Sequence, residues 1–514
     1  MREWSDVSES ITPETSSLTG RTVRAGTAAA ILMAADNLIV LVRTLALSRL
    51  LSPREFGLMG MAFVAITSAE ILSQTGFHRA LVQRRNDPEP YLDTVWCLSV
   101  LRGLALMAVI YFLAPVIGGF FNSTEVVPIL RTLSFITLLL GLTSPRWFLL
   151  EREMKQVQSY LPRIIGISVD VVVTVALALQ WRSVWSIVFG VLAGAAANVV
   201  STFAVAPYRP RLSVKLARAR ELYHFGKHIF RHELLSVFSE QADRLAVGKL
   251  RDVRSLGLYT FASRLVTIPT VAITGLIFRV VFPAFAQVQS EPERVRPAFV
   301  RALGATALLS FPVATGMLAT AREMVPVLFG EKWTPMTVAF QLLCLTCAAR
   351  VIEQTCGVIG GGIGRPDLAV RAGALKLALM VALIVPALLA LDIEGAALAT
   401  LAAAMISAFY LMRRVASLVG LVLSEYLAMV GVPAAACVVM TLVVSGIRLL
   451  APTTTPALML VCLIAAGAVT YVVSVCLIDR WTGSNTVASV LSVVNASYPA
   501  RFGALARLAR RDTP

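Results

Sequence analysis

Apolar segments of membrane-spanning length follow one another along almost the whole chain. A transmembrane helix needs roughly 20 mostly apolar residues, and fourteen segments of this sequence fit that template. Only 15% of the 514 residues are charged, whereas 57% are hydrophobic. Soluble domains carry about a quarter charged residues, so a water-soluble fold of this composition could not cover its surface. The sequence therefore predicts an all-α, polytopic membrane protein with about 14 transmembrane helices.

The expected helices form two sets of six and a final pair. The first set covers 26–48, 56–75, 95–119, 126–149, 164–181 and 184–206. The second set covers 225–248, 256–284, 299–320, 335–359, 368–390 and 394–412, and the last pair covers 425–447 and 456–478. The seventh helix is the weakest of these predictions, because its segment carries several charges.

The net charge of +16 is explained by orientation in a membrane. Excess Lys and Arg gather in the cytoplasmic loops of membrane proteins. With fourteen helices, most of the 46 Lys and Arg residues lie in the two tails and in the loops on the same side. We therefore expect both termini in the cytoplasm, and we do not interpret the basic charge as a site for nucleic acid.

A charged corner occurs twice in the sequence, at a fixed offset of 200 residues. The first corner, Leu45 to Ala62, reads LALSRLLSPREFGLMGMA, and the second corner, Leu245 to Ala262, reads LAVGKLRDVRSLGLYTFA. Seven of the aligned positions are identical. In the first corner Ser52 is expected to cap the next helix, with Pro53 at its first position and Glu55 three residues after the cap. The match indicates an internal duplication.

The duplication divides the chain into domains. Each corner lies where the first helix of a six-helix set turns into the second, and Asp252 takes the cap position in the second corner. We predict two six-helix lobes related by a parallel internal repeat, a plan common among transporters. The expected parts are a polar cytoplasmic tail (1–25), an N-terminal lobe (26–208), a basic cytoplasmic inter-lobe loop (209–224), a C-terminal lobe (225–414), helices 13 and 14 (425–478) and a basic cytoplasmic tail (479–514).

Ionisable side chains lie inside several of the expected helices. Charges within a membrane are costly, and they usually face a cavity or a partner. Cationic residues predominate, so we expect a central cavity that binds an anionic cargo through Arg43, Arg244, Arg264, Arg279, Arg350 and Lys376. The carboxylates that could couple transport to an ion are Asp36, Glu70, Asp243 and Glu353.

Local pairing is an alternative explanation for some of these charges. Glu240 and Arg244 are four residues apart and could neutralise each other on one helix, and so could Arg350 and Glu353. Lys376 has no acidic residue nearby on its own helix, and the same is true of Arg279. These two cations need water, a partner from another helix or an anionic ligand.

Basic residues also lie near the ends of helices. Arg102 and Arg131 are expected to extend towards the membrane surface. The two corners place four basic residues on the outer side, against the general charge trend: Arg49, Arg54, Lys249 and Arg254. They are explained either as part of a capped turn inherited by both lobes or as basic groups at the outer mouth of the cavity.

Catalytic motifs are not found in the sequence. The chain has four histidines, no H-E-x-x-H pattern and no nucleophile elbow, and its expected outer loops are short. A polysaccharide polymerase, a ligase or a lipid-linked glycosyltransferase would need a sizeable outer loop that bears catalytic groups. We therefore expect no enzymatic activity, no catalytic residue, no metal site and no cofactor.

Several motifs resemble those of one family. They are LSRLLSPREFGLMGMA, LSQTGFHRALVQRRN, ADRLAVGKLRDVRSLGLYTFASRL, FPAFAQVQSE, LFGEKWTPM and GIGRPDLAVRAG. In this order and spacing they resemble the Wzx-like bacterial polysaccharide flippases, which belong to the multidrug/oligosaccharidyl-lipid/polysaccharide exporter superfamily. The resemblance covers roughly residues 26–414. These motifs are structural, so they assign no residue that contacts a ligand.

The resemblance implies a transporter with alternating access in the bacterial inner membrane. Its cargo would be an undecaprenyl-pyrophosphate-linked oligosaccharide repeat unit for O-antigen, capsule or exopolysaccharide, with coupling to Na+ or H+. The partners it implies are the lipid-linked oligosaccharide, membrane lipids, and the polysaccharide polymerase and chain-length machinery. The main alternative is a multidrug or cation antiporter of the same superfamily, which would favour intramembrane carboxylates. A flippase for peptidoglycan precursor is a more distant alternative.

Overall fold

The computed structural model is helical throughout the residues that it describes. These are residues 13–73, 87–153, 155–213, 215, 239–288, 292–421, 423–450 and 455–482. Ten helices of this part are long and apolar enough to cross a membrane. One of them, α14 (Asp367–Leu418), has 52 residues and contains two helices joined at a kink. The polytopic, all-α prediction is confirmed, whereas the count of fourteen stays a prediction because 225–238 of the seventh segment lie outside the described residues.

The chain divides into two compact units. Unit 1 comprises residues 1–51 and 62–234, and unit 2 comprises 52–61 and 235–514. The two six-helix lobes stay a prediction, and two boundaries of the units fall inside predicted helices. The change of unit falls at 234–235, inside the segment predicted as the seventh helix. In addition, residues 52–61 of the first corner belong to unit 2, although the residues on both sides belong to unit 1.

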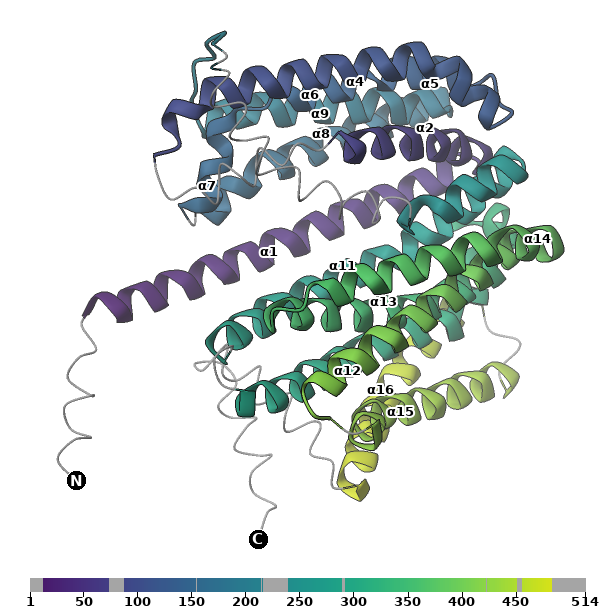
Figure 1. The fold of residues 1–514 in the computed structure, drawn as a ribbon. Helices are drawn as coiled ribbons and strands as arrows, with labels where there is room; N and C mark the ends of the chain where they lie inside the picture. Colours follow the sequence, from purple (N-terminus) through teal and green to yellow (C-terminus); the bar gives the residue numbers. More distant parts are fainter. Residues whose placement is uncertain are drawn as a thin grey trace. The chain divides into compact units, whose positions relative to one another are not determined.

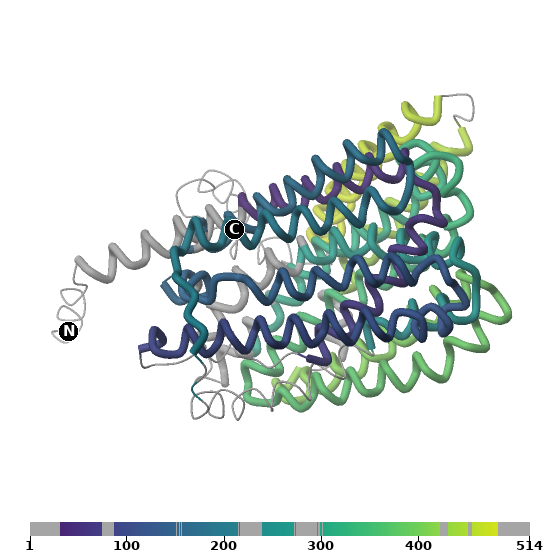
Figure 2. Tube along the Cα trace, turned by 90° about the horizontal axis from the view of Figure 1, so that it is seen from above, coloured from purple at the N-terminus to yellow at the C-terminus, as the bar shows by residue number. Residues whose placement is uncertain are grey.

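Unit 1 contains five of the first six expected spans and the second part of the remaining one, 56–75. Its elements are α1 (Pro13–Leu50), the second part of α2 (Pro53–Leu72), α4 (Leu92–Phe120), α5 (Val126–Leu133), α6 (Phe135–Gly141), α7 (Leu149–Arg152), α8 (Gln156–Trp181) and α9 (Val184–Val205). Helices α8 and α9 run alongside each other, and α4 packs against α5 and α6 (Figures 1 and 2). Helix α8 packs along α1 and α9. The charged groups described below lie on these faces.

The predicted fourth span is not one helix. The structure has α5 and α6 with a break at Ser134, followed by a short 3-10 turn at Pro145–Phe148. Hydroxyl groups add hydrogen bonds at this position, where the backbone N–H of Ser134 still donates to the carbonyl of Leu130 at 2.8 Å. Ser134 Oγ donates to the carbonyl of Arg131, and Thr137 Oγ1 donates to the carbonyl of Gly103 on α4. The apolar helix of the predicted span 126–149 is therefore shorter than predicted, because it ends at Gly141.

Close packing of α8 and α9 depends on small residues. A Cβ atom added to Gly190 would lie 1.7 Å from Oγ1 of Thr174, and one added to Gly194 would lie 2.6 Å from Cβ of Asp170. Small residues let membrane helices approach closely, since van der Waals packing drives their association. Asp170 and Thr174 are thus held in place by the glycine face of α9.

A prediction follows for Gly190 on this face. Gly190→Ala forces a methyl group into the position of the Thr174 hydroxyl, so the protein should lose about 1–3 kcal/mol of stability, the usual effect of overpacking. Thermal unfolding of the detergent-solubilised protein measures the change. Gly119→Ala on α4 is the matched control, because a Cβ there meets nothing within 4 Å. Equal midpoints for the two variants would contradict the packing described.

Unit 2 contains the remaining helices. They are a helical segment at 239–250, α11 (Val253–Val288), α12 (Pro292–Met324), α13 (Thr337–Gly362), α14, α15 (Leu423–Leu450) and α16 (Pro456–Thr482). Helix α13 packs against α11, α12 and α14, while α15 packs against α12 and α16. The helices α12, α13 and α14 lie side by side in Figure 1. This arrangement makes α13 the central helix of the unit.

A kink in α14 separates the predicted eleventh and twelfth spans. Asp392 has φ 54° and ψ −140°, a conformation that ends one helix and starts the next. Arg251 forms an ion pair with Asp392 at 3.0 Å and donates to the carbonyl of Leu388 at 2.6 Å. Gly395 follows the kink, and a Cβ there would lie 1.8 Å from the carbonyl oxygen of Ala387. The kink therefore forms a tight helical hairpin, as the separate ranges 368–390 and 394–412 predicted.

The second corner has the predicted helix cap, and the first corner has the Glu55 half of the predicted capping box. Helix α2 begins at Pro53, and the backbone N–H and hydroxyl of Ser52 both donate to the carboxylate of Glu55. At the second corner the N–H of Ser255 donates to Asp252 at 2.9 Å, and α11 begins at the next residue, Val253. Such caps satisfy groups that the first helical turn leaves unpaired.

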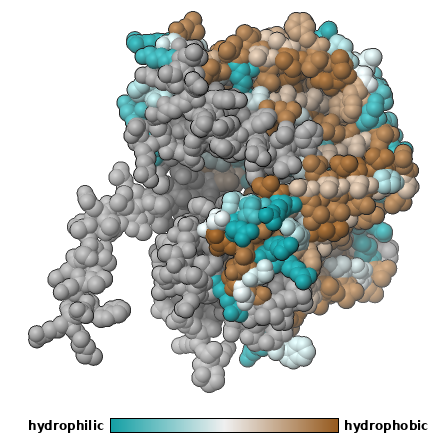
Figure 3. Space-filling model, in the orientation of Figure 1, coloured by the Kyte–Doolittle hydropathy of each residue, from teal (hydrophilic) through white to brown (hydrophobic). Residues whose placement is uncertain are grey.

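The outer surface of the described helices is largely apolar. Figure 3 shows broad hydrophobic areas interrupted by a few hydrophilic groups. Many large apolar side chains are exposed on the helices, including Phe112, Val172, Val381 and Leu442. Soluble monomers rarely expose contiguous apolar surface of this extent, so these faces are suited to contact lipid. The chain is a multi-pass membrane protein.

Candidate functional site

Two ion pairs connect α1 to α8 in unit 1. Arg43 donates to Asp170 at 3.0 Å, and Arg163 donates to Asp36 at 2.9 Å. The pairs are seven residues apart on each helix, so they lie about two turns apart on matching faces. Their polarity is reversed, since α1 supplies the acid of one pair and the base of the other. The expectation that Asp36 and Arg43 share a face of their helix is thus confirmed.

The two pairs differ in burial. The side chains of Arg43 and Asp170 are 7% and 14% exposed, whereas Arg163 is 59% exposed beside a 10% exposed Asp36. Asp170 also accepts a hydrogen bond from Thr174 at 2.8 Å. One oxygen of Asp36 and the Nε of Arg43 are buried without a hydrogen-bond partner. The Arg43–Asp170 pair is therefore enclosed in protein, and Arg163 has access to the surroundings.

Glu70 faces a cation on the neighbouring helix. Arg102 on α4 donates to the hydroxyl of Ser73 at 3.0 Å and is attracted to the carboxylate of Glu70. Arg131 lies over the ring of Tyr111, with its guanidinium carbon 5.2 Å from the ring centre. The expectation that Arg102 and Arg131 extend towards the membrane surface stays a prediction, and within unit 1 both side chains also have the partners named above.

A second polar cluster joins α13 to α14 in unit 2. Lys376 forms an ion pair with Glu353 at 3.2 Å, and Ser407 donates to the other carboxylate oxygen at 2.8 Å. Both charged side chains are largely buried, at 13% and 16% exposed. The pairing of Glu353 with Arg350, suggested by their spacing, is replaced by this contact across helices. The sequence left water, a residue on another helix or an anionic ligand as partners for Lys376. The structure shows a residue on another helix, Glu353.

Two further cations of unit 2 lie on different helices, Arg244 on the segment 239–250 and Arg350 on α13. Arg244 donates to Gln241 at 3.1 Å and to Ser263 at 3.2 Å, so these polar groups are its hydrogen-bond partners in place of the expected Glu240. Arg350 is partly buried on α13, and its Nε is enclosed without a hydrogen-bond partner. Arginine groups with unused donors are suited to bind an anion.

Asp243 belongs to a buried network with aromatic and hydroxyl partners. Tyr259 is fully buried and donates to Asp243 at 2.8 Å, and its oxygen lies 3.0 Å from the Oγ1 of Thr400 on α14. This network links the helical segment 239–250 to α11 and α14. It holds the carboxylate of Asp243 in place, a few residues before the second corner.

The remaining predicted residues are placed as follows. Arg264 is partly buried on α11, and Arg279 lies on the same helix but its side chain is outside the described residues. Of the basic corner residues, Arg49, Arg54 and Arg254 are exposed and Lys249 is partly buried. The cations expected to line one cavity are therefore distributed over both units, and Arg43 and Lys376 are each paired with a carboxylate.

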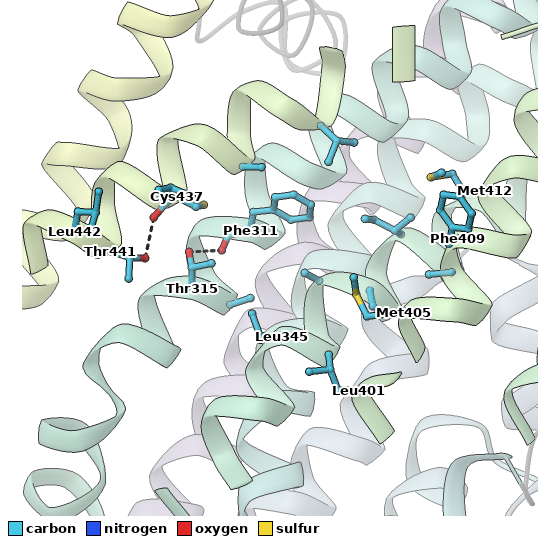
Figure 4. Close-up of a pocket in the computed structure, with 18 residues that line it drawn as sticks. Phe311, Thr315, Leu345, Leu401, Met405, Phe409, Met412, Cys437, Thr441 and Leu442 are labelled. Atoms are coloured by element: carbon cyan, nitrogen blue, oxygen red, sulfur yellow. Dashed lines mark hydrogen bonds between the residues drawn. The ribbon is translucent and has the colours of Figure 1, made fainter. Parts of the chain in front are cut away.

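An apolar pocket lies in unit 2 between α12, α13, α14 and α15. Its volume is about 640 Å³, and the residues labelled in Figure 4 line it: Phe311, Thr315, Leu345, Leu401, Met405, Phe409, Met412, Cys437, Thr441 and Leu442. The two threonine hydroxyls donate to carbonyls of their own helices, at 2.7 Å for Thr315 and 2.8 Å for Thr441. The pocket is thus prepared for an apolar ligand, because its few polar groups are already satisfied.

The pocket and the Lys376–Glu353 cluster share two helices. Ile352 on α13 and Ala408 on α14 line the pocket, and each is next in sequence to a residue of the cluster, Glu353 and Ser407 respectively. Alanines at the contact of the two helices, among them Ala349 and Ala404, keep them close together. A ligand with an apolar chain and an anionic group would meet both kinds of surface on these helices.

Sequence reasoning missed several participants of these clusters. Asp170, Arg163, Tyr259, Thr400 and Ser407 were not singled out. A signal for two of them existed in the sequence, because Arg163 and Asp170 repeat the seven-residue spacing of Asp36 and Arg43 with the charges reversed. Among the residues that the structure describes, no group of three or more His, Cys, Asp or Glu side chains could hold a metal ion.

The fold is that of a class of polytopic transporters. A solved structure of the lipid II flippase MurJ, in an inward closed conformation, matches 88% of this chain and 98% of its own, with a TM-score of 0.74 and 16% identity. A multidrug resistance MATE family transporter of the MOP superfamily, facing inward, matches with a TM-score of 0.62 and 15% identity over 74% of this chain and 94% of its own. At sequence identities of 16% and 15%, the structural similarity to these two proteins establishes the fold of this chain.

The sequence comparison narrows the class to a family. The chain belongs to the polysaccharide biosynthesis protein family, whose model matches residues 46–338. The lipopolysaccharide biosynthesis protein WzxC of Escherichia coli is 25% identical over 67% of this chain and 70% of its own length. The succinoglycan biosynthesis transport protein ExoT of Rhizobium meliloti is 26% identical over 58% of this chain and 61% of its own length. The family resemblance found in the motifs is thereby confirmed.

Proposed function

We propose that the protein is a flippase for lipid-linked oligosaccharides. It would move undecaprenyl-pyrophosphate-linked repeat units from the inner to the outer face of the bacterial cytoplasmic membrane, for O-antigen, capsule or exopolysaccharide. Both termini would lie in the cytoplasm, in accord with the charge distribution. The names of the relatives support this proposal, since they include a lipopolysaccharide biosynthesis protein and a succinoglycan biosynthesis transport protein. The reaction requires no covalent step by the protein.

One observation carries the proposal: an apolar pocket and the buried Lys376–Glu353 ion pair share α13 and α14, and Arg350 on α13 has an enclosed Nε without a hydrogen-bond partner. The cargo has the matching halves, a long apolar chain and an anionic pyrophosphate. Moving a charged group into a medium of low dielectric constant costs on the order of 20 kcal/mol by the ideal Born estimate. Lys376, Arg350 and Arg244 would lower that barrier by replacing water around the pyrophosphate.

Coupling to Na+ or H+ forms part of the proposal. The carboxylates Asp36, Glu70, Asp243 and Glu353 lie within or close to membrane helices, and each has a cation or a hydroxyl within reach. When such a carboxylate is protonated, it would release its cationic partner. The contact between the two helices that this ion pair supports would then change in stability. The polysaccharide polymerase and the chain-length machinery would take up the delivered repeat units.

The proposed function is tested in liposomes that contain the purified protein. A fluorescent polyprenyl-pyrophosphate oligosaccharide is reconstituted with it, and an impermeant glycosidase reports how much sugar reaches the outer leaflet. Sugar on the inner leaflet is protected from the glycosidase. We expect this sugar to become accessible at least ten times faster in liposomes with the protein than in empty liposomes. An equal rate in both preparations, together with efflux of an organic cation, would favour the multidrug antiporter instead.

A substitution within the pocket tests the place of the lipid chain. Ala348→Phe fills part of the pocket, so translocation of a long polyprenyl cargo should fall at least tenfold, while a cargo with a short chain should be affected less. Ala382→Phe is the matched control, because Ala382 is exposed on α14 outside the pocket. Equal loss for the long and the short cargo would mean that the variant acts on folding or on another step.

A further inference from the structure

A proline lies in α12 beside the apolar pocket. Pro312 is part of this helix and directly follows Phe311, one of the residues that line the pocket (Figure 4). Proline has no backbone N–H, so inside a helix the carbonyl four residues earlier loses its regular donor. In α12 that carbonyl belongs to Leu308. A backbone oxygen close to the pocket wall therefore lacks its regular partner within the helix.

The hydroxyl of Tyr471 takes the place of the missing donor. It donates to the carbonyl of Leu308 at 2.9 Å. Tyr471 is 8% exposed and belongs to α16, which packs against α12 and α15. Lipid offers no hydrogen bonds, so a carbonyl that proline frees in a membrane helix needs a partner from elsewhere in the protein. Tyr471 is that partner, and its hydrogen bond joins α16 to α12 at the proline.

A second polar contact holds α12 three turns further along. Arg448 on α15 donates to the carboxylate of Glu323 at 2.7 and 2.8 Å, and it also donates to the carbonyl of Ala319. An apolar core that includes Ala319 and Tyr471 lies between α12, α15 and α16. The residues of α12 that line the pocket all lie between the two contacted carbonyls, those of Leu308 and Ala319. The C-terminal helix pair therefore holds this stretch of α12 at both of its ends.

Tyr471 does not line the pocket, so it can act on the pocket only through α12. The lining residues come from α12, α13, α14 and α15. Helices bend at proline, because one hydrogen bond is missing and the ring clashes with the preceding turn. Loss of the Tyr471 hydroxyl would leave the carbonyl of Leu308 unbound in apolar surroundings and would remove a bond that opposes further bending. Phe311, next to Pro312, would then change its position in the pocket.

We propose that Tyr471 is a positioning residue, which holds α12 at Pro312 in the shape that lets the pocket accept a long polyprenyl chain. The inference rests on the proposed function, because it takes the lipid chain of the cargo as the ligand of the pocket. It gives the C-terminal helix pair a purpose: α15 forms part of the pocket wall, and α16 fixes the part that α12 contributes. A short chain fills less of the pocket, so its binding depends less on the position of Phe311.

Removal of one hydroxyl group tests this role. Tyr471→Phe keeps the ring in the apolar core and removes only the donor. The purified full chain is titrated with fluorescent undecaprenol and with fluorescent geranylgeraniol, a shorter prenol, at a temperature at which parent and variant are both fully folded. We expect the dissociation constant for undecaprenol to rise at least fivefold and that for geranylgeraniol to change less than twofold. An unchanged constant for undecaprenol, or an equal rise for both prenols, would overturn the proposal.

Double variants show whether the hydroxyl acts through the carbonyl of Leu308. Pro312→Ala gives residue 312 its own N–H, so this carbonyl no longer depends on Tyr471. A double-mutant cycle measures the coupling of the two positions. In the Pro312→Ala background, we expect Tyr471→Phe to change the dissociation constant for undecaprenol less than twofold. A fivefold loss that persists in this background would mean that Tyr471 acts in another way, and the proposal would be wrong.

Pro386→Ala provides the matched control background. Pro386 lies inside α14, in the same unit, and does not precede or follow the stretch that Tyr471 contacts. In this background Tyr471→Phe should still weaken undecaprenol binding at least fivefold, and a smaller loss would contradict a specific coupling to Pro312. Transport is measured separately in liposomes. Undecaprenol binding without translocation by the parent protein would overturn the proposed function, whereas failure of the parent to bind undecaprenol would overturn the role of Tyr471.

Discussion

Asp170→Ala is expected to remove most of the folded protein from the membrane fraction. The substitution leaves the guanidinium of Arg43, 7% exposed, without its carboxylate in the interior of unit 1. Removing one partner of a buried ion pair typically costs about 3–5 kcal/mol, because an uncompensated buried charge remains. Thermal unfolding in detergent and the amount of monodisperse protein recovered from membranes measure the loss.

The double variant Arg43→Met with Asp170→Leu is the control for this result. It removes both charges and fills the space with apolar side chains, a replacement that is often neutral for buried pairs. Recovery of stability in the double variant would show that the defect of Asp170→Ala comes from the unpaired charge. If Asp170→Ala is as stable as the parent protein, the Arg43–Asp170 pair is not enclosed as described.

The second pair of α1 and α8 predicts an asymmetry between its two partners. Arg163 is 59% exposed, so it can contact water or another charge when Asp36 is removed. Asp36 is only 10% exposed, so it stays buried and unpaired when Arg163 is removed. Arg163→Ala should therefore destabilise the protein more than Asp36→Ala in the same unfolding measurement. Equal effects of the two substitutions would contradict the difference in burial.

The elements that could be predicted from the sequence were those with a local cause. The cap at Asp252 and the Glu55 half of the capping box at Ser52 depend on residues within one turn, and the end of the eleventh span at Asp392 follows from polar residues between two apolar runs. The duplication was visible as identities at a fixed offset. Its structural consequence, the reciprocal contact of Gly57 and Gly257, was not visible, because a sequence repeat does not tell whether the two copies meet.

The partners of the buried charges depend on contacts between helices. Glu353 binds Lys376 on α14 at 3.2 Å, although Arg350 lies closer in sequence, because the alanine-rich contact of α13 and α14 brings the two helices together. The break at Ser134 has a similar origin, since Thr137 donates to a carbonyl on α4. Hydropathy and spacing describe one helix at a time. They identified the ionisable residues, but the pairing of those residues required the fold.

Lys376→Met is expected to reduce translocation of the lipid-linked oligosaccharide at least tenfold, even in a background that keeps the protein folded. The single substitution of Lys376 cannot separate binding from folding, because it leaves the largely buried Glu353 with only Ser407 as a partner. The informative variant is Lys376→Met with Glu353→Leu, which removes the acid together with the base. We expect this protein to unfold within a few degrees of the parent, because both buried charges are gone.

Translocation by this double variant separates a role in cargo binding from a structural role. If Lys376 replaces water around the pyrophosphate, the double variant stays folded but loses translocation. A neutral lipid with the same polyprenyl chain should then bind to the double variant and to the parent protein with equal affinity. The difference arises because removal of one cation affects only the anionic half of the cargo, whereas the apolar pocket of α12 to α15 is unchanged. Translocation at the parental rate would mean that the Lys376–Glu353 pair only joins α13 to α14. The cationic contact with the cargo would then have to come from Arg350 or Arg244. Variants of these two residues can be tested by the same measurements of folding and transport.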